Sequence, residues 1–237
     1  MEIQQLELKA AKDLKPLKLR SIDGRLAGRW LPRGFELHST GLKFDTDDGL
    51  HWPGGLIKLR YESAGQDQNS FGSFTADQIN LEALSQVITR LPVNPAVQKH
   101  IAAYGPKGLV SAMKGSWQGG FDNLHSYALK GVVNDLTLGA SSFVGGGGDK
   151  VVLGALKGAK LEFDFSQSGG VAKLGINKGE LNLPRLFSPS NVGVLHFESE
   201  LQWQIKGKNI YVQVPHFAFE NADIKSKGHL KWESGNA

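Results

Sequence analysis

The chain lacks cysteine, long apolar runs and any strong charge imbalance, and each absence removes a class of protein. Without cysteine there can be no disulfide bond and no cysteine-ligated metal. No segment approaches the roughly eighteen consecutive apolar residues that a membrane-spanning helix requires. The formal net charge is only +4, and the lysines and arginines are spread along the chain instead of forming blocks, so no nucleic-acid partner is expected.

The residue spacings of common catalytic and metal-binding motifs are also missing. There is no Gly-x-Ser-x-Gly elbow, and the seven histidines show no His-x-His or His-Glu-x-x-His spacing. Residues 145–149 lack the Gly-Lys-Ser/Thr ending of a phosphate-binding loop, because Lys150 is followed by two valines. Asp45, Asp47 and Asp48 do not match a calcium-binding loop. We therefore expect a protein that is not an enzyme and that has no metal and no cofactor.

What the sequence does contain is apolar and polar alternation with a period of two. Leu161, Phe163 and Phe165 alternate with charged residues, and a matching apolar set follows after a turn at 167–170. This pattern predicts strands with one apolar and one wet face. The positions expected on the apolar face are Leu161, Phe163, Phe165, Ala172, Leu174, Ile176, Leu195, Phe197, Leu201, Trp203, Ile205 and Val212.

One stretch, residues 81–104, changes to helical spacing. Leu84 and Ile88 belong to an apolar stripe that follows Asn80, a good N-cap, while Pro95 suits the first turn of a second helix. The other face carries Glu82, Gln86 and Arg90, as expected for a helix that covers a sheet on one side. We expect residues 81–104 to pack outside the sheet or across one end of it, as a cap or a brace. The predicted organisation is a β block over 1–79, a helical pair over 80–104 and a second β block over 105–237.

Three local features complete the prediction. The Asp-Gly pair in 45–49 favours a type I′ hairpin turn, and residues 50–61 are predicted as a single strand. Residues 141–150, which contain four consecutive glycines, are expected to form a flexible loop. The fold class is thus mainly β, a long antiparallel sheet with a short inserted helical pair. Since almost no helix is available to cover the second block, the sheet either closes on itself or leaves an open apolar groove.

A series of short motifs has a recognisable order. It includes Leu91-Pro92, Pro106-x-Gly108, Trp117-x-Gly119, Tyr127, Leu153-Gly-Ala-Leu-Lys-Gly158, Gly169-Gly170, Leu181-x-Leu-Pro-x-Leu-Phe187, Leu201-x-Trp203 and Gly228-x-Leu-x-Trp232. In this order the chain resembles an internal periplasmic segment of the YhdP-type, AsmA-like envelope proteins of Gram-negative bacteria. These are related to TamB-like, bridge-type lipid transfer proteins. The resemblance is best over 81–232, and Val152 to Gly154 departs from it by replacing the family's usual Pro-Gly-Val.

The resemblance implies a sheet curled into a gutter with an apolar inner wall. It implies conduction of phospholipid between the inner and outer membranes, which supports the outer-membrane barrier. The partners would be phospholipid acyl chains and, through the full-length protein, both membranes. No N-terminal anchor is recognisable, so we expect a periplasmic piece of a longer, inner-membrane-anchored protein. The alternative is a closed β domain that serves as a structural or glycan-binding module of the envelope.

Overall fold

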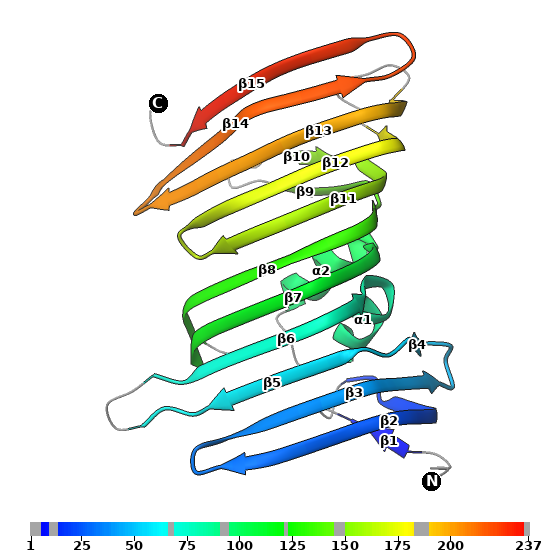
Figure 1. Cartoon of the computed structure of the whole chain (residues 1–237), viewed down its shortest axis with the longest axis vertical. Coiled ribbons are helices and arrows are strands. Elements are labelled where there is room, and N and C mark those ends of the chain that lie inside the picture. Colours follow the sequence, from blue (N-terminus) through cyan, green and yellow to red (C-terminus); the bar gives the residue numbers. More distant parts are fainter. Residues whose placement is uncertain are drawn as a thin grey trace. The chain divides into compact units, whose positions relative to one another are not determined.

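The computed structural model describes residues 6–9, 14–65, 69–90, 95–120, 123–144, 150–182 and 190–234 (Figure 1). It is mainly β, as the alternation predicts. The strands are β1 (Leu6–Leu8), β2 (Leu17–Leu31), β3 (Gly34–Thr46), β4 (His51–Trp52), β5 (Leu56–Glu62), β6 (Phe71–Asn80), β7 (Lys107–Gly120), β8 (Asn123–Leu138), β9 (Ser141–Val144), β10 (Lys150–Leu153), β11 (Ala155–Ser166), β12 (Gly169–Asn182), β13 (Asn191–Lys206), β14 (Asn209–Glu220) and β15 (Lys225–Glu233). The helices are α1 (Leu81–Ile88) and α2 (Pro95–Tyr104).

The main sheet is antiparallel, with the strand order β1-β2-β3-β5-β6-β7-β8-β11-β12-β13-β14-β15 and with β4 paired to β3. A separate two-stranded sheet pairs β9 with β10. The chain divides into two compact units: unit 1 is 1–102 with 109–127, and unit 2 is 103–108 with 128–237. No helix in the described part of the chain is long and apolar enough to cross a membrane.

The helical pair forms where its spacing predicts. The side chain of Asn80 accepts a hydrogen bond from the backbone N–H of Ala83 at 2.9 Å, which satisfies one of the free donors in the first turn of α1. Within unit 1, α1 contacts β4 and β6 (Figure 1). Ala83 is the residue of this helix that is buried. The helix therefore covers the sheet at the end of β6 from which it starts.

The turn after β3 differs from the predicted type I′ turn. Gly49 donates its backbone N–H to the carbonyl of Thr46 at 3.1 Å and has a positive φ of 87°, whereas Asp47 and Asp48 keep negative φ angles. This is a type I turn closed by a left-handed glycine, the arrangement of a three-residue hairpin loop. The predicted strand over 50–61 is also wrong, because it is interrupted between β4 and β5, where Pro53 has no N–H to donate and Gly54 and Gly55 have positive φ angles.

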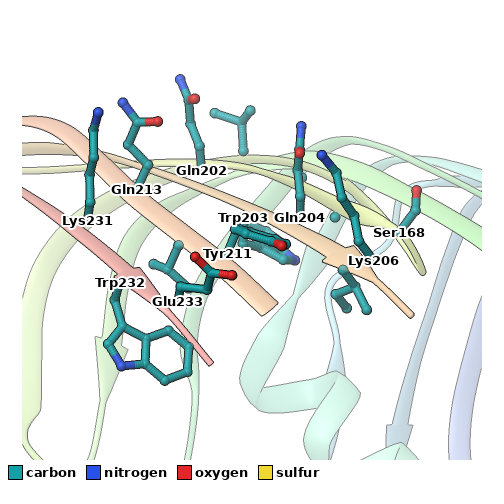
Figure 2. Close-up of a pocket in the computed structure, with 15 residues that line it drawn as sticks. Ser168, Gln202, Trp203, Gln204, Lys206, Tyr211, Gln213, Lys231, Trp232 and Glu233 are labelled. Atoms are coloured by element: carbon teal, nitrogen blue, oxygen red, sulfur yellow. The ribbon is translucent and has the colours of Figure 1, made fainter. Parts of the chain in front are cut away.

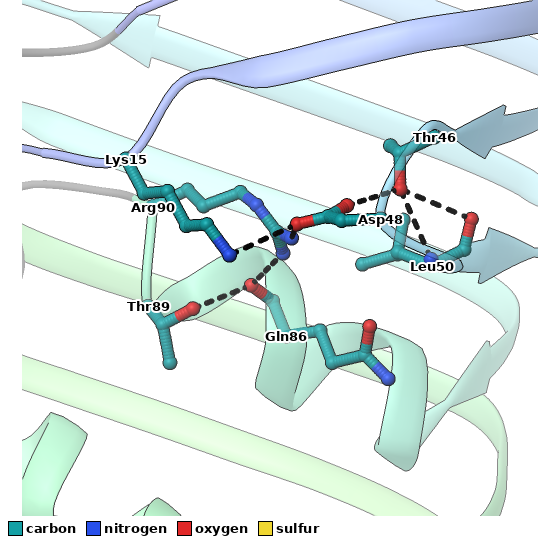
Figure 3. Close-up of polar contacts among 7 residues, drawn as sticks. All are labelled: Lys15, Thr46, Asp48, Leu50, Gln86, Thr89 and Arg90. Carbon is teal, nitrogen blue, oxygen red and sulfur yellow. Dashed lines mark hydrogen bonds and ion pairs between the residues drawn. The ribbon is translucent and has the colours of Figure 1, made fainter.

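Arg90 is the clearest error of the helical prediction (Figure 3). Its side chain is not in solvent but only 7% exposed, and its guanidinium lies 2.6 Å from the Asp48 carboxylate and 2.6 Å from the Gln86 carbonyl. Asp48 also accepts from the Thr46 hydroxyl at 2.7 Å and pairs with Lys15 at 3.2 Å. The helix is thus tied to the β3–β4 turn by a carboxylate, a link that spacing along the helix cannot reveal.

In unit 2 one stretch that was expected to be a loop contains strands. The expected flexible loop over 141–150 contains strand at both ends, because β9 and β10 pair in register from Ser141 with Leu153 to Val144 with Lys150. The glycines at 145–148 lie outside the described residues, as do Leu91-Pro92 and the 183–187 part of the motif series.

Candidate functional site

The apolar face of unit 2 is built by the pairing register of β11, β12 and β13. Leu161 lies opposite Leu174, and Phe163 lies opposite Ala172, which in turn lies opposite Leu201. Directly opposite residues share a face and bring their side chains together. The ring centroids of Phe163 and Phe165 are 5.8 Å apart. The register therefore places these residues on one face of the sheet.

Near the hairpin turns, this face carries an aromatic row that crosses β11 to β15. We call it row 2, and its members in strand order are Phe165, Gly170, Trp203, Val212 and Trp232. The rings of Phe165 and Trp203 lie with centroids 6.0 Å apart. Trp232 and Leu230 on β15 extend the apolar face beyond the residues that sequence reasoning selected, although they follow the same alternation.

Exposure divides this face along the strands. Away from the turns Ile176 is fully buried, and Ala159, which lies directly opposite it on β11, is buried as well. At and beside row 2 large side chains stay partly open: Leu201 is 37%, Ile205 39% and Trp232 52% exposed. The described part of unit 2 therefore leaves an apolar stripe in solvent, the kind of surface that marks a binding site.

Leu195 departs from its predicted companions. It is 52% exposed, whereas its neighbour Val194 is buried. On the adjacent strand Lys178 has a φ of 59°, a left-handed conformation that is rare for a residue other than glycine. Phe197 resumes the pattern opposite Ile176 and Phe219.

A hollow of about 920 Å³ lies across β12 to β15 at row 2 (Figure 2). Its lining includes Trp203, Val212 and Trp232. Figure 2 shows Gln202, Gln213 and Lys231 pointing to one side of these strands and Trp232 to the other. The two sides of a single layer of strands thus differ sharply in polarity.

The opposite face of unit 2 carries charges of alternating sign. Glu162, Lys173 and Glu200 lie directly opposite one another on β11, β12 and β13. Lys160 donates to Glu162 at 2.6 Å, and this hydrogen bond, with the attraction of the lysine charge, lowers the pKa of the Glu162 carboxyl. Lys173 pairs with Glu200 at 3.6 Å. Such pairs favour a hydrated surface.

Unit 1 repeats the two-faced arrangement with other residues. We call its aromatic row, close to the hairpin turns, row 1; its members from β2 to β7 are Trp30, Phe35, Tyr61, Gly72 and Trp117. Trp30 is 86% exposed and meets Phe35 edge to face at 6.2 Å, and Phe35 meets Tyr61 at 5.9 Å. Sequence reasoning did not select row 1 as a site, although Trp30 and Phe35 flank a recognisable turn.

The wet face of unit 1 carries an arginine ladder. Glu36 accepts from Arg29 at 2.7 Å and pairs with Arg60 at 3.3 Å, and Arg60 also pairs with Glu62. Among the residues described here, no group of three or more His, Asp or Glu side chains is placed to hold a metal ion.

These features define a class: an antiparallel sheet protein whose units each have one aromatic-lined apolar face and one ion-paired face. Comparison with known families gives a more specific result. The family model described as YhdP protein matches residues 1–236, so the chain belongs to the YhdP protein family. Membership indicates an AsmA-like envelope protein. No curated protein and no solved structure matches the chain.

Proposed function

We propose that this chain is a segment of a periplasm-spanning, inner-membrane-anchored protein that conducts phospholipids between the inner and outer membranes. In this proposal acyl chains lie along the apolar face of unit 2, and headgroups remain in water. The observation that carries it is the partly open stripe at row 2, with a face of paired charges behind it. The proposal also draws on membership in the family.

The energetics suit passive conduction. Shielding one methylene group from water contributes about 0.8 kcal/mol, so several contacts along an acyl chain hold a lipid without any specific bond. A row of similar apolar positions on successive strands lets the chain exchange one contact for the next with a small barrier. This mechanism requires no reactive side chain.

Photo-crosslinking at adjacent positions of β13 tests the proposal. A benzophenone amino acid replaces Leu201, on the apolar face, or Gln202, on the wet face, in the envelope protein that contains this chain. We expect phospholipid adducts at position 201 and far fewer at position 202, because neighbouring residues on a strand face opposite sides. Equal labelling, or none at position 201, would contradict lipid contact on this face.

A charged residue in place of Leu201 distinguishes the lipid-conducting groove from the alternative, a closed structural or glycan-binding module. Because Leu201 is 37% exposed, an aspartate there keeps contact with water, and we expect Leu201→Asp to fold normally. In this experiment the benzophenone amino acid replaces Phe163, on the same face, and we expect the Leu201→Asp change to abolish the lipid adducts formed at position 163. Gln202→Asp is the matched control and should retain them. Unfolding of Leu201→Asp would indicate a closed core, and intact adducts would exclude this stripe as the lipid path.

A further inference from the structure

A second hollow, of about 400 Å³, lies on the charged face of unit 2 across β11 to β14. Its lining includes Gly175 on β12 and Glu198 on β13. These two residues lie directly opposite each other, and a Cβ atom added to Gly175 would have the Phe197 carbonyl oxygen, at 3.9 Å, as its nearest contact. The glycine therefore leaves open space beside the Glu198 carboxylate.

A β-bulge forms the other side of the hollow. The pairing of β14 with β15 is interrupted between Val214 and Phe217, and its pairing with β13 is interrupted at the same place. Pro215, which has no N–H to donate to a ladder, and His216 lie in this interruption and line the hollow. A bulge redirects the side chains that it carries. Here Nδ1 of His216 lies 3.9 Å from the Glu198 carboxylate.

The lining of the hollow holds three carboxylates and two lysines. Glu162 pairs with Lys160 at 2.6 Å, and Glu200 pairs with Lys173 at 3.6 Å. Both lysines are therefore engaged, and the carboxylate of Glu198 is left. Within the described part of the chain, no lysine or arginine lies at ion-pair distance from it. The hollow thus has one excess negative charge while its histidine is neutral.

The hydrogen bonding of His196 leaves a second acceptor beside Glu198. Nδ1 of His196 lies 3.0 Å from the Asn177 side-chain oxygen, and because that oxygen can only accept, Nδ1 is the donor. In the neutral ring Nε2 is then an acceptor, and it lies 3.7 Å from the Glu198 carboxylate. Two acceptors therefore face each other and need a donor between them.

Other charged groups surround Glu198 and its two histidines on every neighbouring strand. They are Lys160 and Glu162 on β11, Lys173 on β12, Glu200 on β13, Glu220 on β14, and Lys225 and Lys227 on β15. Lys225 pairs with Glu220 at 2.7 Å, and Lys227 lies one strand beyond Ala218, the residue opposite Glu198. The donor that Glu198 and neutral His196 need is thus not supplied by these groups.

The charge and the donor requirement select the ligand. A primary ammonium carries one positive charge and three N–H donors, so it can donate to a carboxylate and to a histidine nitrogen at once. A metal ion needs more ligands, and the described residues gather no group of three or more His, Asp or Glu side chains placed to hold one. The volume of the hollow is in the range of sites for small organic molecules.

We propose that this hollow binds a primary ammonium group, which donates to the Glu198 carboxylate and to Nε2 of neutral His196. Protonation of His196 and His216 supplies the positive charge in place of the ligand and releases it. The ammonium belongs either to a free amine or to an ethanolamine headgroup. The site is on the charged face, so the proposal does not depend on lipid conduction.

Amide chemical shifts of the isotope-labelled chain test the proposal, with butylammonium as the probe and butyrate as the control of opposite charge. At about pH 8, where histidine is neutral, we expect saturable shifts at Gly175 and Glu198 with butylammonium and none with butyrate. Absence of these shifts with butylammonium would overturn the proposal. Glycerophosphoethanolamine, compared with glycerophosphocholine, which has no N–H donor, distinguishes the sources. Binding of the former identifies an ethanolamine headgroup as a ligand, and binding of butylammonium alone identifies a free amine.

The pH dependence tests the role of the histidines. At about pH 5.5 an ordinary histidine is about nine-tenths protonated, so we expect an affinity for butylammonium about tenfold lower than at about pH 8. In His196→Gln, whose amide does not titrate, this difference should shrink. Equal affinities at the two pH values in the unsubstituted chain would overturn release by the histidines.

Substitutions locate the site. Glu198→Gln keeps the shape and removes the charge, and we expect it to abolish the shifts at about pH 8. Glu180→Gln is the matched control, because Glu180 pairs with Lys157 outside the hollow, and it should bind as before. Both glutamates are more than half exposed, so neither change should unfold the chain. Gly175→Val fills the space beside Glu198 and should also abolish binding. Retained affinity in Glu198→Gln would overturn the proposal.

Discussion

Unit 1 and unit 2 carry similar aromatic rows but bury the rest of their apolar residues by different means. In unit 1 the buried set includes large side chains near the helix, such as Leu50 and Trp52, together with the Arg90–Asp48 link. In unit 2 the buried set consists of aliphatic side chains within the strands, such as Ile176 and Val194.

The comparison shows that the aromatic rows are exposed whether or not a helix covers another part of the unit. Unit 1 has a helix packed on β4 and β6, yet Trp30 in row 1 is 86% exposed. Unit 2 has no such helix in its described residues, and Trp232 in row 2 is 52% exposed. Aromatic rows beside the hairpin turns therefore stay partly in solvent whichever way the rest of the unit is buried.

The largest effect is expected from a charge placed in the buried part of unit 2. Ile176→Asp puts a carboxylate where the side chain is fully buried, and the loss of packing and the desolvation should lower the free energy of unfolding by about 3–5 kcal/mol. Leu201→Asp, in the open stripe, should cost about 1 kcal/mol or less, since surface substitutions have small effects. Urea denaturation followed by circular dichroism measures both. Equal costs would mean that the two parts of the face are not distinct.

A smaller loss is expected when the link of helix to turn in unit 1 is broken. Asp48→Asn removes the charge that pairs with buried Arg90, which should cost about 1–3 kcal/mol. The lower part of that range applies, because the Asp48 side chain is 38% exposed and water screens the pair. Fluorescence of Trp52, close to the turn, should report the earlier unfolding. Asp47→Asn, one residue away, is the control and should have almost no effect.

The same link predicts a pH dependence of unit 1. Hydrogen bonds from Thr46 and then Arg90 and Lys15 hold the pKa of the Asp48 carboxyl well below its usual value. Its stabilising contribution is therefore complete above the unfolded pKa of about 3.9 and is lost as the pH falls through the lower folded pKa. We expect the stability difference between the unsubstituted chain and Asp48→Asn to shrink below about pH 4. A constant difference down to acid pH would contradict this.

Much of the fold could be predicted from the sequence because period two is a local signal. The alternation of Phe163 and Phe165 with Glu162 and Asp164 places them on opposite faces without knowledge of any partner strand. Asn80 likewise predicts the start of α1 because its hydrogen bond reaches only three residues ahead. Signals of this kind need no tertiary information.

What could not be predicted depends on contacts between segments that are distant in the sequence. Arg90 looks solvent-exposed on a helical wheel, and only the fold brings it to Asp48, 42 residues away. The close fit of the Trp117 ring over Gly72 on the neighbouring strand could not be predicted, because alternation gives the face of a residue and not its partner. Leu195 is 52% exposed although its alternation matches that of Phe197, and period two alone does not predict how much of a side chain is covered.

The smallest effects are expected at the charged faces, where the two units differ in the kind of cation. Glu36 in unit 1 accepts from Arg29 and also pairs with Arg60, whereas Glu200 in unit 2 has Lys173 at 3.6 Å and the Gln202 amide at 2.6 Å. Arginine's planar fork loses less freedom for each hydrogen bond than a lysine ammonium, so Glu36→Gln should cost more than Glu200→Gln.

Because all these pairs are at the surface, each cost should be about 0.2–1 kcal/mol and should fall in 1 M salt. Urea denaturation at low and high salt measures the difference, with Glu233→Gln at the C-terminal end of β15 as a control. A larger cost for Glu200→Gln than for Glu36→Gln would contradict this prediction. It would show that the lysine pair on the wet face of unit 2 stabilises the fold more than the arginine ladder of unit 1 does.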